Sequence, residues 1–187
     1  MDILLLKVSE RLTWTELKGY MGCLSGSRQN GIQKKKSDSG KINALLSQLL
    51  VLSELSKRTD IPVRKISFEF GAHGKPYLKD GGGVQFSLSH TNGAICAAFS
   101  DNGEIGIDIE RADRRINEAM YKRVLSGEEL ARLASNSDFL RFWVQKEAFL
   151  KRLGIGITRD LRGINTSELP DTAVLEHGSF YIGASGK

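Results

Sequence analysis

The chain has 187 residues, 40% of them hydrophobic, and a net charge of +5 with a pI of about 9.2. Its apolar runs are too short to span a bilayer and its N-terminus has no signal-peptide pattern, so we expect a cytoplasmic protein. The positive charge suits nucleic acid, anionic membranes, polyphosphate ligands or acidic proteins, and charge alone does not choose among them.

The size of the chain suits one globular core or two small packed subdomains. Cys23 and Cys96 lie far apart in the sequence, and we expect both to be buried free thiols with no disulfide or metal role. Basic residues cluster around Lys34–Lys36 and around Arg64–Lys65. The first cluster has no interleaved aromatic residues, and no zinc-finger or helix-turn-helix pattern occurs. Both observations disfavour nucleic-acid binding.

In the first half, runs and alternation of apolar residues predict strands around one long helix. We expect strands at 2–8, 66–70, 84–88 and 94–99, a short helix at 13–22, and a long helix at 42–57 with leucines on one side. The Gly-, Ser- and Lys-rich segment 25–40 predicts a mobile loop. Asp101-Asn-Gly103 is typical of a hairpin turn.

In the second half, helical patterns predominate. They predict helices at 118–125 and 138–153, and Gly154 suits the position that ends the second of these. Ser126-Gly-Glu-Glu129 is a capping box that starts a further helix. Strands are expected at 161–165 and 180–184.

The strand pattern of residues 105–110 is the most informative feature. Alternation places Ile105, Ile107 and Ile109 on one face and Gly106, Asp108 and Glu110 on the other. The two carboxylates then project side by side, about 7 Å apart. A bound cation such as Mg²⁺ would make this arrangement favourable, and Gly106 would leave room for a ligand. The alternative is an exposed acidic strand face.

The helix at 138–153 carries a second set of charges in an apolar setting. Lys146 falls within the apolar arc of the helix, where an ammonium needs a partner. Glu147 and Lys151 lie together at the edge of that arc. Their alternative explanation is an ordinary ion pair between positions i and i+4. Together, the three residues favour a functional site.

Four short motifs occur in order along the chain and carry a resemblance to a known family. They are Gly74-Lys-Pro76, Phe86-Ser-Leu-Ser-His90, Gly106-Ile-Asp-Ile-Glu110, and a run from Trp143 through Lys146-Glu147-Ala148 and Lys151 to Gly154. Each is weak alone, but the four together are specific. Over residues 20–165 the chain resembles the 4′-phosphopantetheinyl transferase superfamily, of the surfactin-synthetase-activating (Sfp-like) type.

The resemblance implies a fold and a reaction. The fold is α+β, a pseudo-dimer of two similar α/β halves with the cofactor cleft between them. Residues 1–103 would form the N-terminal half with the coenzyme A contacts, and residues 104–187 the C-terminal half with the metal-binding and catalytic motifs. The reaction transfers the 4′-phosphopantetheine arm of coenzyme A to a serine of an acyl or peptidyl carrier protein. It uses Mg²⁺, or Mn²⁺ in its place, and releases adenosine 3′,5′-bisphosphate.

The resemblance also implies roles for individual residues. The metal ligands would be Asp108, Glu110 and Glu147. The catalytic residues would be Glu147, which takes the proton of the carrier serine, and Lys151, which contacts phosphate. The coenzyme A contacts would be Arg28, Lys41, Gly74, Lys75, Pro76, Ser89, His90 and Lys151. Glu129 matches an acidic family position, but its capping box already explains it.

Two features depart from the family pattern. Family members usually carry basic residues that bind the 3′-phosphate of coenzyme A, and this set is incomplete here. Arg28 matches one of these positions, but Asn43 stands near another. We therefore expect Lys41 or the run Lys34–Lys36 to bind the 3′-phosphate. Residues 180–184 resemble the last strand of the family, but little sequence precedes them. We therefore expect a thinner sheet in the second half.

The implied partner is an acidic carrier protein, bound transiently through steering by positive charge and an apolar contact near Met120–Leu125. We expect a monomer that binds no nucleic acid and no membrane. Two other hypotheses stay open. One is a non-catalytic carrier-protein-binding module of the same fold, and the other is a basic nucleic-acid-binding protein.

Overall fold

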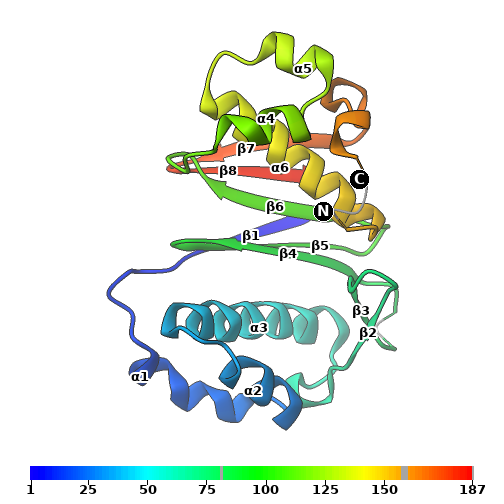
Figure 1. The fold of residues 1–187 in the computed structure, drawn as a ribbon. Coiled ribbons are helices and arrows are strands. Elements are labelled where there is room, and N and C mark those ends of the chain that lie inside the picture. The colour runs from blue at the N-terminus through cyan, green and yellow to red at the C-terminus, as the bar shows by residue number, and fades with distance from the viewer. Residues whose placement is uncertain (81, 157–159, 187) are drawn as a thin grey trace.

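The computed structural model describes residues 1–80, 82–156 and 160–186, and Figure 1 shows its fold. The strands are β1 (Asp2–Lys7), β2 (Phe68–Phe70), β3 (Pro76–Leu78), β4 (Gln85–Thr91), β5 (Ala94–Ser100), β6 (Gly106–Arg111), β7 (Thr172–His177) and β8 (Phe180–Ser185). The α-helices are α1 (Trp14–Leu17), α2 (Gly26–Gln33), α3 (Asp38–Thr59), α4 (Glu118–Val124), α5 (Gly127–Arg132) and α6 (Asn136–Leu153). The 3₁₀ helices are η1 (Lys18–Cys23), η2 (Val63–Lys65), η3 (Leu161–Gly163) and η4 (Thr166–Glu168).

Two three-stranded antiparallel sheets organise the chain, with the strand orders β1-β5-β4 and β6-β8-β7. In each sheet the strand that comes last in the sequence, β5 or β8, lies in the middle. It pairs on one side with the first strand, β1 or β6, and on the other side with β4 or β7. A long helix, α3 or α6, lies between the first and second strands in sequence. The α+β class is therefore confirmed. The shared topology supports a pseudo-dimer, which stays a prediction together with its boundaries and its cleft.

The two sheets pack against each other in the middle of the molecule, with α3 and α6 on their outer faces (Figure 1). Small side chains of β5, Ala94, Cys96 and Ala98, meet Ile107 and Ile109 of β6 in this central layer. Every residue of β5 is buried, because its other face packs on α3. The carboxylate strand is therefore fixed by a core that both sheets share.

The helix α6 lies directly on the backbone of its sheet at two glycines. A Cβ atom added at Gly106 would lie 1.9 Å from the carbonyl oxygen of Ala148, and one at Gly183 would lie 2.0 Å from that of Val144. Because these two positions of β6 and β8 carry no side chain, the helix can approach the strand backbone closely. The expectation that Gly106 leaves room for a ligand is wrong, because α6 fills that space.

The two predicted long helices are confirmed, although α3 begins at Asp38 and α6 at Asn136, ahead of their predicted starts. The side chain of Ser37 caps α3, that of Ser135 caps α6, and the capping box of Ser126 and Glu129 starts α5. Gly154 ends α6 in the left-handed conformation, with φ of 66°. The capping box at Ser126 and the end at Gly154 were predicted from these local side chains, whereas the caps at Ser37 and Ser135 were not.

Three predictions of local structure are wrong. Segment 25–40 contains α2 and the start of α3, because Ile32 is buried and holds the polar helix α2 onto the core. Residues 161–165 include the 3₁₀ helix η3, and the strand that pairs with β8 is β7. The turn at Asp101–Gly103 joins the two sheets instead of forming a hairpin, since β6 pairs with β8.

In the described ranges each of these two sheets has three strands, so a sheet thinner than the family pattern stays a prediction. Two further expectations differ from the structure. Cys96 is buried, but Cys23 is exposed. Val124 and Leu125 lie in the core beneath α4, so most of the apolar surface expected near Met120–Leu125 is not available to a partner. Of the helices in the described ranges, none has the length and apolar character needed to cross a membrane.

Candidate active site

Asp108 lies on β6 where the strand passes beneath α6, and it is 6% exposed. Its Oδ1 atom accepts hydrogen bonds from Ser89 Oγ and Lys151 Nζ, each at 2.7 Å. Ser89 comes from β4 in the first sheet and Lys151 from α6. The structure thus brings together three predicted site residues from three elements. Lys151 of α6 thus forms an ion pair with Asp108 of the neighbouring strand β6.

Glu147 lies on the same helix as Lys151, one turn earlier, and is also 6% exposed. Burial and the neighbouring Asp108 carboxylate raise the pKa of Glu147 to about 7, against the opposing effect of Lys151. Among the described residues, Glu147 Oε1 and Asp108 Oδ2 are buried oxygen atoms with no hydrogen-bond partner. Buried partnerless carboxylate oxygens are costly unless a ligand satisfies them.

Glu110 completes the group of carboxylates but has partners of its own. It forms an ion pair with Arg114 and accepts a hydrogen bond from Thr91 Oγ1 at 3.4 Å. Burial and the charge of Asp108 raise the pKa of Glu110, while Arg114 opposes the shift. The carboxylates of Asp108, Glu110 and Glu147 therefore lie close enough to act on one another electrostatically.

The three carboxylates are close but not assembled around a common point. Within the described ranges, no group of three or more His, Cys, Asp or Glu side chains is placed to hold a metal ion. Lys151 holds an oxygen of Asp108, and Arg114 holds one of Glu110. The donor set still fits a hard cation, because it offers carboxylate oxygens of which two are buried and partnerless.

A cavity of about 310 Å³ adjoins these residues and is lined by the β2–β3 turn, by β4 and by the C-terminal end of α6. The predicted residues Gly74, Lys75, Pro76 and Lys151 all line it. Lys75 donates from Nζ to the carbonyl oxygen of Arg152 at 2.7 Å, which connects the β2–β3 turn to the end of α6. Burial lowers the pKa of Lys75. The predicted coenzyme A contacts of this turn therefore lie beside the charged group.

His90, the next residue after Ser89, is exposed at the end of β4. Desolvation of its ring lowers its pKa, and the positive charges of Lys151 and Lys35 add to this effect. Lys35 therefore lies near enough to His90 to act on it electrostatically. Lys35 belongs to the run Lys34–Lys36, whose grip on the 3′-phosphate stays a prediction.

The structure places Arg28 and Lys41 elsewhere. Arg28 lines a different cavity, of about 360 Å³, donates to the carbonyl oxygen of Ile66 and lies over the ring of Phe68. Lys41 pairs with Asp38 at 3.1 Å and lies 5.8 Å from the centre of the Trp14 ring. Neither contact joins these two residues to the group around Asp108, so their predicted roles stay untested.

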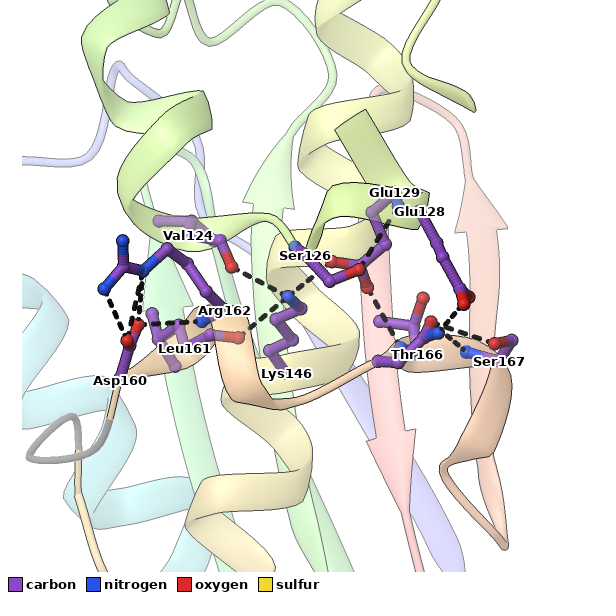
Figure 2. A network of polar contacts seen from close by, with 11 residues as sticks. Val124, Ser126, Glu128, Glu129, Lys146, Asp160, Leu161, Arg162, Thr166 and Ser167 are labelled. Atoms are coloured by element: carbon purple, nitrogen blue, oxygen red, sulfur yellow. Dashed lines mark hydrogen bonds and ion pairs between the residues drawn. The ribbon is translucent and has the colours of Figure 1, made fainter. Parts of the chain in front are cut away.

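Lys146 finds its partner inside the protein, in the network that Figure 2 shows. Its Nζ atom donates to Glu129 Oε2 at 2.5 Å and to the carbonyl oxygens of Val124 and Leu161. Both charged side chains are fully buried. Burial alone would raise the pKa of Glu129, but the hydrogen bonds from Lys146 and from the backbone of Ser126 and Thr166 outweigh it and lower that pKa. Lys146 and Glu129 therefore tie α4, α5, α6 and segment 161–166 together.

Sequence reasoning missed the hydroxyl groups and the arginine that surround the carboxylates. Ser87 Oγ accepts from the backbone N–H of Ile107 at 3.1 Å, and Thr91 and Arg114 contact Glu110. The spacing of Ser87, Ser89 and Thr91 on one strand face was a usable signal. Nothing in the sequence indicated that this face meets β6.

Comparisons with known proteins agree with the motifs. The family model of the 4′-phosphopantetheinyl transferase superfamily matches residues 104–182, which include the three carboxylates and Lys151. The 4′-phosphopantetheinyl transferase Sfp of Bacillus subtilis (strain 168) is 28% identical over 186 residues, 91% of this chain and 80% of that protein. The chain is thus similar to the 4′-phosphopantetheinyl transferase superfamily, as its motifs indicated.

Further phosphopantetheinyl transferases are similar to the chain over shorter stretches. The L-aminoadipate-semialdehyde dehydrogenase-phosphopantetheinyl transferase of Candida glabrata is 31% identical over 148 residues, 72% of this chain. The 4′-phosphopantetheinyl transferase psf-1 of Bacillus pumilus is 32% identical over 123 residues, 63% of this chain. The chain spans 56% of the length of the first and 52% of the second.

Proposed function

We propose that this chain transfers the 4′-phosphopantetheine arm of coenzyme A to a serine of an acyl or peptidyl carrier protein. The observation that carries the proposal is the position of Asp108, Glu147 and Lys151, which lie together beside a cavity lined by the predicted coenzyme A contacts. Similarity to the superfamily and to its named transferases supports the reaction class. The proposal includes the pseudo-dimer, with residues 1–103 binding coenzyme A and residues 104–187 carrying the catalytic groups.

The residues of the chain have distinct tasks in this proposal. Gly74, Lys75 and Pro76 hold coenzyme A in the cavity. His90 offers a ring N–H group to the phosphates of coenzyme A, and Lys151 offers them positive charge. The serine hydroxyl of the carrier attacks the phosphorus that bears the pantetheine, and Glu147 accepts the serine proton. The bond from that phosphorus to the adenosine 3′,5′-bisphosphate breaks, and Lys151 stabilises the charge that develops on the leaving phosphate.

Asp108, Glu110 and Glu147 would hold a divalent cation, for which their oxygen donors are suited. When bound, Mg²⁺ neutralises negative charge on the diphosphate. Lys151 and Arg114, which now hold oxygens of Asp108 and Glu110, must then share or release them.

The direct test is the intact mass of an apo carrier protein after incubation with this protein, coenzyme A and Mg²⁺. We expect the carrier to gain one phosphopantetheine group, and we expect no gain with Asp108→Ala, whose folding is checked by circular dichroism. A carrier that binds the wild-type protein but gains no mass would show a non-catalytic binding module instead. Salt-sensitive DNA binding with no response to coenzyme A would favour the nucleic-acid hypothesis.

A further inference from the structure

Hydroxyl groups occupy alternate positions of β4 on the face that meets the second sheet. Ser87, Ser89 and Thr91 pair in register with Ala98, Cys96 and Ala94 of β5. Those three residues of β5 face the core shared with β6 and β8. The hydroxyl groups therefore point toward β6, which carries the carboxylates.

The first hydroxyl group holds the backbone of the carboxylate strand. Ser87 is buried, and its Oγ atom accepts a hydrogen bond from the N–H of Ile107, the residue before Asp108. The strand β6 is at the edge of its sheet and pairs with β8 on one side. Ser87 thus satisfies a buried backbone donor that has no partner strand on its other side.

The other two hydroxyl groups hold the carboxylates themselves. Ser89 Oγ donates to Asp108 Oδ1 at 2.7 Å, and Thr91 Oγ1 donates to Glu110 Oε2 at 3.4 Å. Each hydroxyl group leaves the second oxygen of its carboxylate free of that contact. Groups that hold the ligands of a metal in this way fix ligand orientation and affect metal affinity.

We propose that Ser87 and Thr91 are positioning residues of the transferase site, acting with Ser89 as a hydroxyl ladder that aligns the carboxylates of β6. This inference rests on the proposed function. The ladder crosses from the first sheet to the second, so the half that holds coenzyme A also sets the orientation of the acidic residues in the other half. Asp108 and Glu110 are thereby positioned by contacts outside their own sheet.

The test compares Ser87→Ala, Thr91→Val and the double variant with Ser47→Ala. Ser47 is also buried, and within the described part of the chain its hydroxyl group has no hydrogen-bond partner, so its loss removes no such contact. Three quantities are measured on the full chain: hydrogen exchange at the Ile107 amide without ligands, Mn²⁺ affinity by electron paramagnetic resonance with coenzyme A bound, and KM and kcat with an apo carrier protein.

We expect Ser87→Ala to speed exchange at the Ile107 amide about tenfold, since its hydrogen bond is lost. The double variant should bind Mn²⁺ on the order of tenfold more weakly, and Ser87→Thr with Thr91→Ser, which keep the hydroxyl groups, should restore affinity. The proposal is overturned if the double variant binds Mn²⁺ as tightly as Ser47→Ala, or if the wild type binds no Mn²⁺. Normal Mn²⁺ binding by a wild type that leaves the carrier unmodified would instead overturn the proposed function.

Discussion

At the scale of single residues, the ammonium group of Lys151 decides how the carboxylates are arranged. It lies 2.7 Å from Asp108 Oδ1 and competes with any cation for that oxygen. The sequence suggested an ion pair with Glu147 as the simpler explanation, but helix spacing alone cannot show that a strand passes beneath the helix. The sequence indicated Asp108, Glu147 and Lys151 as candidate site residues, but it did not indicate which side chains they would contact.

Lys151→Met tests whether this ammonium serves catalysis or only folding. Turnover should fall by a factor on the order of 10² or more, as expected when a group aimed at developing charge is removed. The Mn²⁺ affinity of the protein without coenzyme A should rise about tenfold, because a positive charge near the carboxylates is gone. Enzyme kinetics and Mn²⁺ titration measure the two effects. Lys57→Met, at a side chain that is 74% exposed, is the control; a loss of only a few-fold at Lys151 would return it to a structural role.

At the scale of elements, the position of α6 depends on glycines in the strands below it. Gly183→Ala would place a Cβ atom 2.0 Å from the carbonyl oxygen of Val144 and push the helix outward. We expect a loss of unfolding free energy of about 1–3 kcal/mol or more, together with reduced turnover, because α6 carries Glu147 and Lys151. Chemical denaturation measures the first effect. Gly31→Ala in α2, where an added Cβ has nothing within 4 Å, should not lower stability.

The pair of Lys146 and Glu129 holds α5 and segment 161–166 to α6. Removing one charge of the pair should lower the stability of the protein more than removing both. Lys146→Met leaves the buried Glu129 without its cation and should destabilise the protein by about 3–5 kcal/mol. The double change Lys146→Met with Glu129→Leu removes both charges and should recover part of that loss. Thermal and urea unfolding of the two variants decide this. Equal stability of Lys146→Met and the wild type would show that the pair contributes little.

Elements with strong local signals were predictable, and elements fixed by distant contacts were not. Periodic apolar residues predict the helices α3 and α6. The helix α2 does not, because Ile32 is its buried residue among polar neighbours. The strand β7 is equally hidden, since its exposed edge position leaves Leu175 45% exposed and gives a weak pattern.

At the scale of the whole molecule, two sheets of the same topology share a central core, and Lys75 of the β2–β3 turn and Lys151 of α6 line one cavity. The motifs indicated two halves through the family resemblance, whereas composition and periodicity did not show an internal repeat. The contacts of β4 with β6 were also not predictable, because the Ser and Thr residues that make them carry no sequence signal of a partner strand.

The net charge of +5 leads to a prediction about the carrier protein. An acidic carrier should be steered to this basic surface, so kcat/KM for the carrier should fall about tenfold or more from low to high salt, mainly through the association rate. The measurement keeps coenzyme A saturating at each salt concentration. Lys34→Ser with Lys36→Ser, at two exposed positions, should flatten the dependence. A response to salt that is already flat in the wild-type protein would mean that the basic surface serves coenzyme A alone.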